Sequence, residues 1–366
     1  MTNRTAVSQA KRVVVKVGSS SLTLPDGHLD HERIARLAEA LSALHGRGVR
    51  VVLVTSGAIA AALAPLGLRR RPRDLETQQA AAAVGMGLLI RHYSDAFAEH
   101  GVKVAQLLLT VEDVLRPKTY RNALNTISRL FRLDVVPIIN ENDTVATHEI
   151  RFGDNDRLAA LVAHLVRADA LVLLSDVDGL YTAHPDTPGA EKLAVVEDVA
   201  ELKVDTSRLG SRVGTGGMQT KLQAADIATQ AGVSVVLGHA NDLERALAGE
   251  DVGTYFPARK KRRPRRLLWL AFAAEPRGWL HVDAGARRAL LDTKASLLPA
   301  GVREVKGTFA EGEPVEIIGP DNEPLGRGFA GYSSAELASE AGHSSNEAGH
   351  TNQRPAVHRD VMILTD

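Results

Sequence analysis

Cysteine is absent from this 366-residue chain, and its absence narrows the available chemistry. Without cysteine there can be no disulfide framework, no thiolate nucleophile and no cysteine-ligated zinc. The composition suits a reducing compartment, and we expect a cytoplasmic protein. Any chemistry must therefore use oxygen and nitrogen side chains or the backbone.

Net charge and long apolar runs are lacking as well. Lysine and arginine together number 44, as do aspartate and glutamate, so no global field draws the chain to nucleic acid or to an anionic membrane. Residues 1–11 lack the apolar stretch of a secretory signal. The apolar run 267–274 is shorter than the roughly 20 residues that a membrane-spanning helix needs. We interpret this run as a buried strand and expect no membrane partner.

Two periodicities alternate through the first two thirds of the chain. Apolar, β-branched runs predict strands, and apolar residues at helical spacing predict helices that lay one face on a sheet. The predicted strands are residues 13–15, 51–54, 102–109, 135–139, 170–174 and 233–237, and the helical stripes are Ile34, Leu37, Leu41, Leu44 and Leu158, Leu161, Val162, Leu165. This alternation predicts an α/β fold with an open, mostly parallel sheet.

The composition changes abruptly after residue 258. Residues 259–266 hold seven basic side chains around one proline, and like charges extend a chain. We therefore predict a first domain at 1–258, a basic linker with a connecting strand at 259–275 and a second domain at 276–366. Short β-like runs at 280–282, 302–305, 315–318 and 357–364, with one helix at 285–291, make the second domain small and mostly β. The Ser, Gly, His and Asn-rich segment 333–354 predicts a mobile loop.

Polar clusters follow several predicted strands, where open parallel sheets bind ligands. Lys16 ends the first strand, and the small residues 17–21 after it would let backbone amides approach a phosphate. Ser56 follows the second strand and opens a helix, where it would cap the helix or help to bind an anion. A strand-end lysine and a plain helix cap remain the alternatives.

A second pair of clusters is rich in acceptors and amide donors. Asn140 and Asp143 follow the strand at 135–139, and Asp154, Asn155 and Asp156 open the next helix. Together they could hold an ammonium group and a carboxylate. The alternative is ordinary turn chemistry, which also favours Asn and Asp.

A glycine-rich segment at 214–221 enters a helix with a lysine one turn inside, a pattern that can wrap a polyphosphate. It matches neither the P-loop nor the dinucleotide fingerprint. Ser175 and Asp176 follow another apolar strand and could face a nucleotide or its metal. The histidines lack partners at metal-ligand spacing, so no protein metal site is predicted. The candidates in the glycine-rich segment are Thr215, Gly216, Gly217, Met218, Gln219, Thr220 and Lys221.

Six segments, in this order, resemble the amino acid kinase family, and in particular its branch that phosphorylates L-glutamate and ends in a PUA domain. They are VVVKVGSS at 13–20, VTSGAIAAA at 54–62, INENDTVAT at 139–147, FGDNDRLAA at 152–160, LSDVDGLYT at 174–182 and GTGGMQTKLQAA at 214–225. The resemblance continues through a PUA-like segment to residue 363. It implies a three-layer sheet fold followed by a small β-rich domain.

The resemblance also implies site roles. Lys16 and Lys221 would contact the ATP phosphates and act with Asp156 in catalysis, while Ser175, Asp176 and residues 215–221 would line the nucleotide site. Ser56, Asp143 and Asn155 would hold glutamate, with Asn140 and Asp154 close to the reacting groups. The implied cofactors are ATP as co-substrate and Mg²⁺.

The activity implied is ATP-dependent phosphorylation of the glutamate side-chain carboxylate to L-glutamyl 5-phosphate, the first step of proline biosynthesis. L-Proline would be a feedback inhibitor, the chain would form a homo-oligomer, either a dimer or a tetramer, and a glutamyl phosphate reductase would take the product. A free glutamate side chain has a pKa near 4.3, so at neutral pH it is already an anionic nucleophile. No general base is therefore required.

Two other functions stay open at this point. The chain could be another amino acid kinase, acting on aspartate, N-acetylglutamate or a nucleoside monophosphate. It could also bind RNA through the PUA-like domain and the basic linker. A solvated hinge is the favoured interpretation of the linker, because the net charge is zero and aromatic residues for stacking are few.

Overall fold

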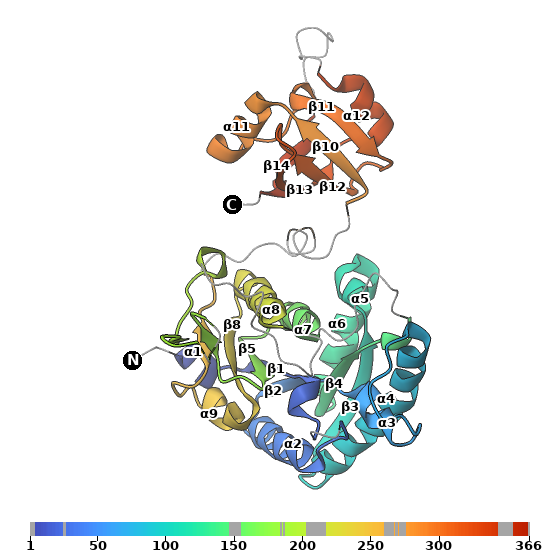
Figure 1. Ribbon diagram of the computed structural model, residues 1–366, viewed down its shortest axis with the longest axis vertical. Helices are drawn as coiled ribbons and strands as arrows, with labels where there is room; N and C mark the ends of the chain where they lie inside the picture. Colours follow the sequence, from blue (N-terminus) through green and yellow to red (C-terminus); the bar gives the residue numbers. More distant parts are fainter. Residues whose placement is uncertain are drawn as a thin grey trace. The chain divides into compact units, whose positions relative to one another are not determined.

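The computed structural model describes residues 4–24, 27–145, 155–183, 185, 187–202, 217–259, 267, 270, 276–342 and 354–364. The chain divides into two compact units, Met1–Arg262 and Arg263–Asp366 (Figure 1). None of the described helices is both long enough and apolar enough to cross a bilayer.

A seven-stranded sheet forms the centre of the first unit, in the order β3-β4-β2-β1-β5-β8-β9. Neighbouring strands are parallel except β8 and β9, which are antiparallel. The strands are β1 (Arg12–Val17), β2 (Arg50–Val54), β3 (Lys103–Leu109), β4 (Val135–Glu141), β5 (Ala170–Ser175), β8 (Ser234–His239) and β9 (Thr254–Phe256). All six predicted strands of this region are confirmed. Because the six parallel strands run the same way, they end at one edge of the sheet, the carboxyl edge, and begin at the opposite amino edge.

Helices cover both faces of this sheet. On one side lie α2 (His31–Gly46), α4 (Leu75–Ala98) and α9 (Leu243–Leu247), and on the other α7 (Asn155–Leu165) and α8 (Met218–Gln230) (Figure 1). The other described helices of the unit are α1 (Thr5–Ser8), α3 (Ala58–Leu63), α5 (Val111–Leu115) and α6 (Pro117–Arg132), with short 3-10 turns at Ser19–Ser21, Asp143–Val145, Val199–Glu201 and Ala240–Asp242. The three predicted layers are thus confirmed.

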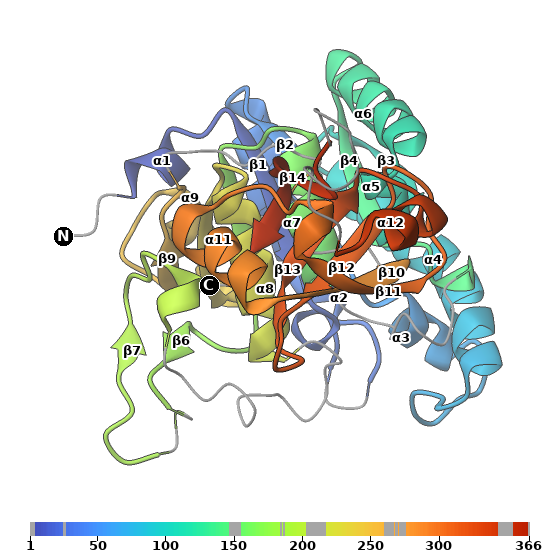
Figure 2. The ribbon, with the colours of Figure 1, turned by 90° about the horizontal axis from the view of Figure 1, so that it is seen from above.

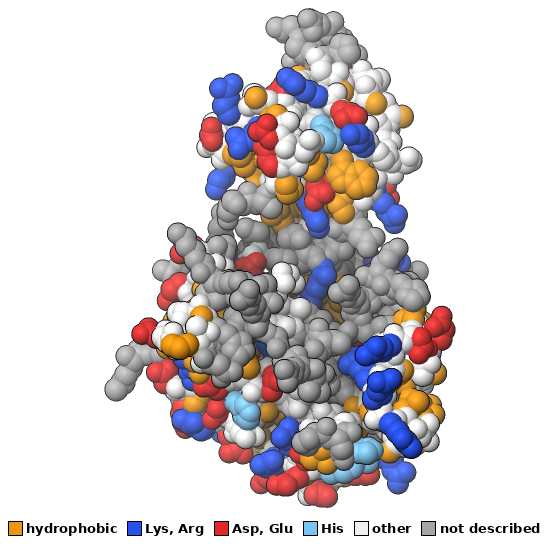
Figure 3. Space-filling view, in the orientation of Figure 1, with side chains coloured by type: hydrophobic (Ala, Val, Ile, Leu, Met, Phe, Trp, Pro, Cys, Tyr) orange, Lys and Arg blue, Asp and Glu red, His pale blue; other side chains and the backbone are white. Residues whose placement is uncertain are grey.

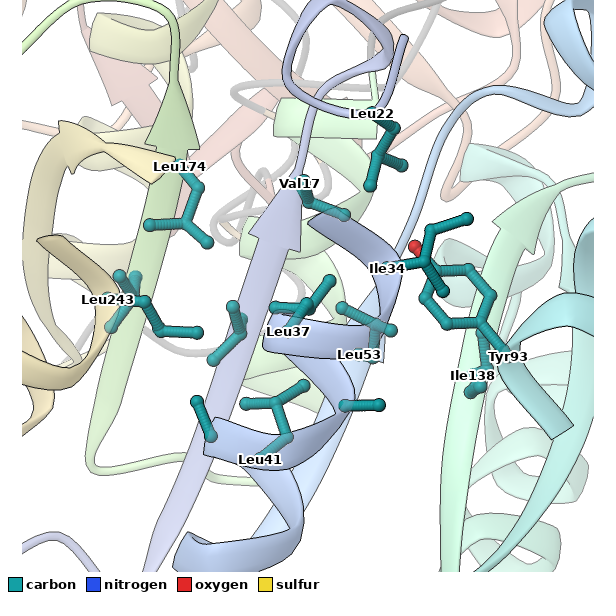
Figure 4. Close-up of a cluster of buried hydrophobic side chains, with 14 of the residues drawn as sticks. Val17, Leu22, Ile34, Leu37, Leu41, Leu53, Tyr93, Ile138, Leu174 and Leu243 are labelled. Atoms are coloured by element: carbon teal, nitrogen blue, oxygen red, sulfur yellow. The ribbon is translucent and has the colours of Figure 1, made fainter. Parts of the chain in front are cut away.

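Helix α2 shows how the sequence makes this packing. Asp30 caps the helix by accepting a hydrogen bond from the backbone N–H of Arg33 at 3.1 Å. All four residues of its predicted apolar stripe are buried. In Figure 4, Leu37 and Leu41 lie over the strands with Val17, Leu53 and Leu174 beneath them. One face of the helix, set by its 3.6-residue period, therefore packs on one face of the strands, set by their two-residue period.

Strand β1 separates two layers of side chains. Val13, Val15 and Val17 belong to the apolar cluster that includes the α2 residues. Lys16 points to the other face, where it pairs with Asp156 of α7. The alternation of side chains along a strand thus places one lysine opposite α7 while its two neighbours are buried under α2.

Two smaller pieces lie at the margins of the first unit. Helix α6 lies beside β3 and β4 at the outer side of the sheet (Figure 2). Strands β6 (Leu180–Tyr181) and β7 (Lys192–Leu193) pair antiparallel as a separate ribbon. Leu180 is tied to the main sheet because its N–H donates to Thr254 Oγ1 of β9 at 2.7 Å.

The second unit is built on a five-stranded sheet, in the order β11-β10-β12-β13-β14, over one apolar core. Its elements are β10 (Gly278–Val282), α11 (Ala284–Thr293), a 3-10 turn at Pro299–Gly301, β11 (Val302–Gly307), β12 (Pro314–Ile318), β13 (Pro324–Ala330), α12 (Ser334–Glu340) and β14 (Val357–Leu364). The predicted strands and the helix at 285–291 are confirmed. Strand β13 was not predicted, because Gly326 and Gly328 interrupt its apolar pattern.

Those two glycines let backbones come close. A Cβ on Gly326 would lie 2.1 Å from the carbonyl oxygen of Ile363, and one on Gly328 would lie 2.1 Å from Val357 Cγ1. Both contacts are to β14, the partner of β13. The glycines are therefore part of the strand pairing and do not break it.

Two predictions about this unit are wrong in part. The predicted loop at 333–354 contains helix α12, which begins with a capping box of Ser333 and Glu336 and buries Leu337. In the predicted strand at 267–274, Leu267 and Leu270 are helical, and both belong to an apolar cluster with Phe329. A short apolar run does not distinguish strand from helix, and the spacing of these two leucines suits a helix face. Residues 343–353 and the rest of 267–274 lie outside the described residues.

Candidate active site

Most of the predicted site residues meet at the carboxyl edge. Lys16 and Asn140 lie near the ends of β1 and β4, and Ser56 follows β2. Helices α7 and α8 begin at this edge with Asn155, Asp156 and, one turn into α8, Lys221. Helix N-termini present unpaired N–H groups and partial positive charge, which suits an anionic ligand.

An ion cluster of Lys16, Asp156 and Lys221 lies at the centre of this edge. Asp156 is 0% exposed, and the two lysines are 4% and 8% exposed. Lys16 Nζ pairs with Asp156 Oδ1, and Lys221 Nζ lies 3.2 Å from Asp156 Oδ2. Burial by itself would raise the pKa of Asp156, but the two ammonium groups lower the pKa to about 2. One ionised carboxylate therefore pairs with two buried cations.

The start of α8 brings further predicted residues to the cluster. Thr220 Oγ1 lies 3.2 Å from Asp156 Oδ2 and donates to the carbonyl of Gly217 at 2.8 Å. Gly217 precedes the helix in an extended conformation, and Met218 is buried while Gln219 is exposed. Thr215 and Gly216, predicted for the same loop, lie outside the described residues.

An amide cluster of Asn155, Asn140, Ser56 and Thr55 lies beside the ion cluster. Asn155 Nδ2 contacts the carbonyl oxygen of Thr55 at 2.7 Å, Ser56 Oγ at 2.9 Å and Asn140 Oδ1 at 3.0 Å. Within the described part of the chain, Asn155 Oδ1 and Asn140 Nδ2 are buried and have no hydrogen-bond partner. Buried polar atoms are normally paired, so this acceptor and this donor suit a polar ligand.

Asp143 lies in the turn after β4. It interacts electrostatically with Arg71, a residue that the sequence analysis did not single out. Burial raises the pKa of Asp143 to about 6, against the opposing effect of the Arg71 guanidinium. Burial also lowers the pKa of Arg71. Arg71 comes from the segment between α3 and α4, about 70 residues away in the sequence, and no local pattern marks it. Asp154, predicted for the same region, lies outside the described residues.

Helix α4 packs against the segment that carries Ser56, through residues that the sequence analysis also missed. Tyr93 is fully buried, and its hydroxyl lies 2.8 Å from Thr55 Oγ1. A Cβ on Gly85 would lie 1.7 Å from the carbonyl oxygen of Ala58, so only glycine permits the close packing of α3 on α4. Gly57 starts α3 with φ of 102°, in the left-handed region. These contacts fix the segment that carries Ser56.

The predicted nucleotide residues on β5 lie next to this arrangement. Ser175 ends β5, and the residue before it, Leu174, pairs with Val17 of β1. Ser175 Oγ donates to Asp176 Oδ1 at 2.9 Å, and Asp176 is exposed. The region that the structure describes holds no group of three His, Asp or Glu residues arranged to bind a metal.

Comparisons with known proteins agree with this architecture. Residues 11–239 match the amino acid kinase family, and residues 278–350 match the PUA domain. Curated proteins named glutamate 5-kinase are similar over 99% of the chain. Those from Cutibacterium acnes, Thermobifida fusca and Streptomyces coelicolor are 56%, 52% and 52% identical, and the matches cover 94%, 95% and 98% of their own lengths.

Solved structures resemble the first unit in fold. The structure of a carbamate kinase from Giardia lamblia bound to AMP-PNP matches 69% of this chain and 100% of its own, with a TM-score of 0.50. Its sequence identity is 19%, so the likeness concerns the fold alone. Together with the two domain matches, it confirms the predicted fold class, a parallel-sheet α/β unit followed by a small β-rich unit.

Proposed function

The chain belongs to the amino acid kinase family and, within it, to the glutamate 5-kinases, and on this premise we propose that it uses ATP to phosphorylate the side-chain carboxylate of L-glutamate. The product is L-glutamyl 5-phosphate, the first intermediate of proline biosynthesis. The observation that best supports this chemistry is the ion cluster, in which two buried lysines share one buried carboxylate at the carboxyl edge.

The reaction needs electrostatic help more than proton transfer. Glutamate arrives ionised, since its side-chain pKa is about 4.3. The barrier comes from bringing this carboxylate in line with the γ-phosphorus of ATP against the repulsion of two anions. Lys16 and Lys221 offset that repulsion, and they contact the phosphates as charge develops on the transferring group.

Asp156 acts on the two lysines. Its carboxylate stays ionised because both ammonium groups lower its pKa. One of its oxygen atoms holds Lys16 Nζ and the other holds Lys221 Nζ, so the two cations lie close together. Both ammonium groups are thereby positioned to contact the phosphoryl group. Such preorganised charge in a buried place is more effective than the same charge in water.

The amide cluster and Asp143 bind the amino acid. Asn155 Oδ1 and Asn140 Nδ2 offer one acceptor and one donor, and Ser56 adds a hydroxyl. Asp143 pairs with the α-ammonium group, and Asp154, which lies outside the described residues, stays a candidate for a role beside the reacting groups. Aspartate is shorter than glutamate by one methylene, which by pocket size alone separates the two by about 1–3 kcal/mol. Fixed anchors for the α-amino and α-carboxylate groups therefore set the selectivity.

ATP binds along the ends of β5 and α8. Ser175 and Asp176 line the nucleotide, and residues 215–221 enclose its phosphates, among them Thr215, Gly216, Gly217, Met218, Gln219, Thr220 and Lys221. Asp176, exposed after the end of β5, is the described carboxylate that would face a magnesium ion bound with ATP. When bound, such an ion would supply positive charge that offsets the charge of the phosphates.

Trapping of the acyl phosphate tests the activity. The purified protein, given ATP, Mg²⁺ and L-glutamate, is expected to form a hydroxamate with hydroxylamine and to release ADP. L-Aspartate, N-acetyl-L-glutamate and UMP are the matched alternatives in the same assay. Glutamate must give the highest kcat/KM; a higher value for any other acceptor, or no hydroxamate with glutamate, would refute the proposal.

An RNA-binding role is the second function left open by the sequence. On the face shown in Figure 3, Lys and Arg side chains of the second unit are interspersed with Asp and Glu side chains. RNA affinity that falls steeply with salt, and that is lost when the basic residues of 259–266 are replaced by glutamine, would establish this role. Absence of measurable RNA affinity at low salt would rule it out, and affinity unaffected by these replacements would exclude the linker from RNA binding.

We propose three further properties of the enzyme, which its resemblance to the family implies. L-Proline inhibits it at or near the glutamate site, the chain forms a homo-oligomer, and a glutamyl phosphate reductase consumes the product. Competition of proline with glutamate in steady-state kinetics tests the first property. Light scattering of the purified protein tests the second, and faster NADPH oxidation in a coupled assay than the free product allows tests the third.

A further inference from the structure

Basic side chains gather at the amino edge of the first unit, at the opposite end of β1 from the ion cluster. A hollow of about 590 Å³ is lined by Lys11, Arg12, Gly48, Arg50, Arg167 and Asp169. An adjoining hollow of about 220 Å³ shares Arg12 and Arg50 and adds Phe131 and Arg132 from the end of α6, beside Leu124, Ser128 and Val166. We refer to both together as the arginine hollow.

The charges of the arginine hollow are unbalanced. Among the residues that the structure describes, five basic side chains line it, and Asp169 is the only acidic one. Asp169 Oδ2 already accepts the backbone N–H groups of Lys11 at 2.8 Å and Arg12 at 2.9 Å. One carboxylate, engaged by the backbone, thus faces five cations in a chain whose formal net charge is zero.

The arginines are held in place at this edge. Arg12 Nη1 donates to the carbonyl of Val166 at the end of α7. The guanidinium carbons of Arg12 and Arg50 each lie 5.8 Å from the centroid of the Phe131 ring, within cation–π range. Arg12 Nε is buried and has no hydrogen-bond partner among the described residues. The hollow therefore presents guanidinium groups that these contacts hold in place.

Like charges repel each other here. Burial lowers the pKa of Arg12, and the guanidinium groups of Arg50 and Arg167 lower it further, against the opposing effect of Asp169. A bound anion would relieve this repulsion and accept hydrogen bonds from the guanidinium groups that line the hollow. Planar guanidinium groups match the oxygen spacing of phosphate and form two parallel hydrogen bonds with it.

We propose that the arginine hollow binds a phosphate-type anion with two or more negative charges, as free polyphosphate or as the polyphosphate of a nucleotide. Five cations around an open hollow exceed what a single carboxylate requires. The site is separate from the ion cluster, because the two lie at opposite edges of the sheet and involve different ends of β1.

Calorimetric titration with pyrophosphate, at constant ionic strength set by chloride, tests the proposal. The Lys16→Ala variant weakens phosphate binding at the carboxyl edge and leaves the arginine hollow intact. In this background, the additional replacements Arg50→Gln and Arg167→Gln are expected to weaken pyrophosphate binding by about tenfold or more. Both arginines are exposed, and thermal melting verifies that the variants fold.

The matched control replaces Arg91 and Arg116, two exposed arginines outside the hollow, by glutamine in the same background. It changes the net charge equally and is expected to leave pyrophosphate affinity within about twofold. Equal loss in both double variants, or no pyrophosphate binding in the Lys16→Ala background, would overturn the proposal. ADP distinguishes the sources: tighter binding of ADP than of pyrophosphate, abolished by Arg50→Gln and Arg167→Gln, identifies a nucleotide, and weaker binding identifies free polyphosphate.

Discussion

The two edges of the central sheet differ in whether their positive charges are buried and paired or exposed and in excess. At the carboxyl edge, Lys16 and Lys221 are buried and share the carboxylate of Asp156. At the amino edge, five basic residues line an open hollow that contains Asp169. One strand, β1, contributes a cation to each arrangement.

The difference follows from the cost of desolvation. A buried charge without a partner is strongly unfavourable, so the ion cluster needs its internal counter-ion. Exposed charges are screened by water and salt, so the arginine hollow tolerates an excess that a ligand can use. We therefore expect replacements at the carboxyl edge to change stability and turnover greatly, and those at the amino edge to change stability little.

The largest effect is expected for Asp156→Asn. This change leaves two buried ammonium groups without their carboxylate and should lower the free energy of unfolding by about 3–5 kcal/mol. Urea unfolding followed by circular dichroism measures it. Asp95→Asn removes an exposed carboxylate that pairs with Arg91 and should cost less than about 1 kcal/mol. Equal losses in the two variants would show that burial does not distinguish the edges.

Lys16→Ala should lower kcat by about a hundredfold to a thousandfold, as for the loss of one donor that stabilises developing charge. The measurement is ADP release at saturating ATP and glutamate. Lys192→Ala, which removes a half-exposed lysine paired with Asp178, serves as the control and should stay near the wild-type rate. Near-normal turnover of Lys16→Ala would exclude the lysine from the phosphoryl-transfer step.

Binding of glutamate should depend on pH through Asp143. Its pKa is raised to about 6, so the carboxylate is protonated below that pH and can no longer pair with the α-ammonium group. The KM for glutamate should therefore rise up to about tenfold for each pH unit below 6, while the KM for ATP changes less. Asp143→Asn should abolish this dependence and raise the KM for glutamate by about tenfold to a hundredfold. A pH dependence that persists in Asp143→Asn would assign it to another group.

The smallest effect is expected at the amino edge. In the absence of ligand, Arg50→Gln with Arg167→Gln should raise the free energy of unfolding by about 0.5 kcal/mol or less at low ionic strength, because like charges are removed. The gain should vanish near 0.5 M salt, where screening acts over roughly 4 Å. Urea unfolding at the two salt concentrations measures it. A loss of stability at low salt would mean that the two arginines support the fold more than they repel each other.

The sequence predicts the sheet well because strand and helix periods are local. The β-branched runs of β1 and β2 and the stripe of α2 need no knowledge of distant residues. Strand β13 escaped prediction because Gly326 and Gly328 are explained only by the close approach of β14. Helix α12 could have been predicted, since Ser333 and Glu336 have the spacing of a capping box.

The candidate site divides in the same way. Lys16, Asn155, Asp156 and Lys221 lie in segments whose position at strand ends or helix starts can be read from the sequence. Local patterns do not reveal Arg71 or the α4 residues Tyr93 and Gly85, because each contacts or interacts with a segment more than 25 residues away in the sequence. Local sequence patterns indicate the candidate site residues. They do not indicate which distant side chains hold those residues in position.

The alternation of β1 makes the length of this strand critical for the enzyme. Val13, Val15 and Val17 face the aliphatic layer under α2, while Lys16 faces Asp156. One residue inserted between Arg12 and Lys16 would turn the lysine into that aliphatic layer and a valine towards the carboxylate. Deletion or insertion of a single codon in this stretch should therefore abolish activity, even though it removes neither the lysine nor the aspartate.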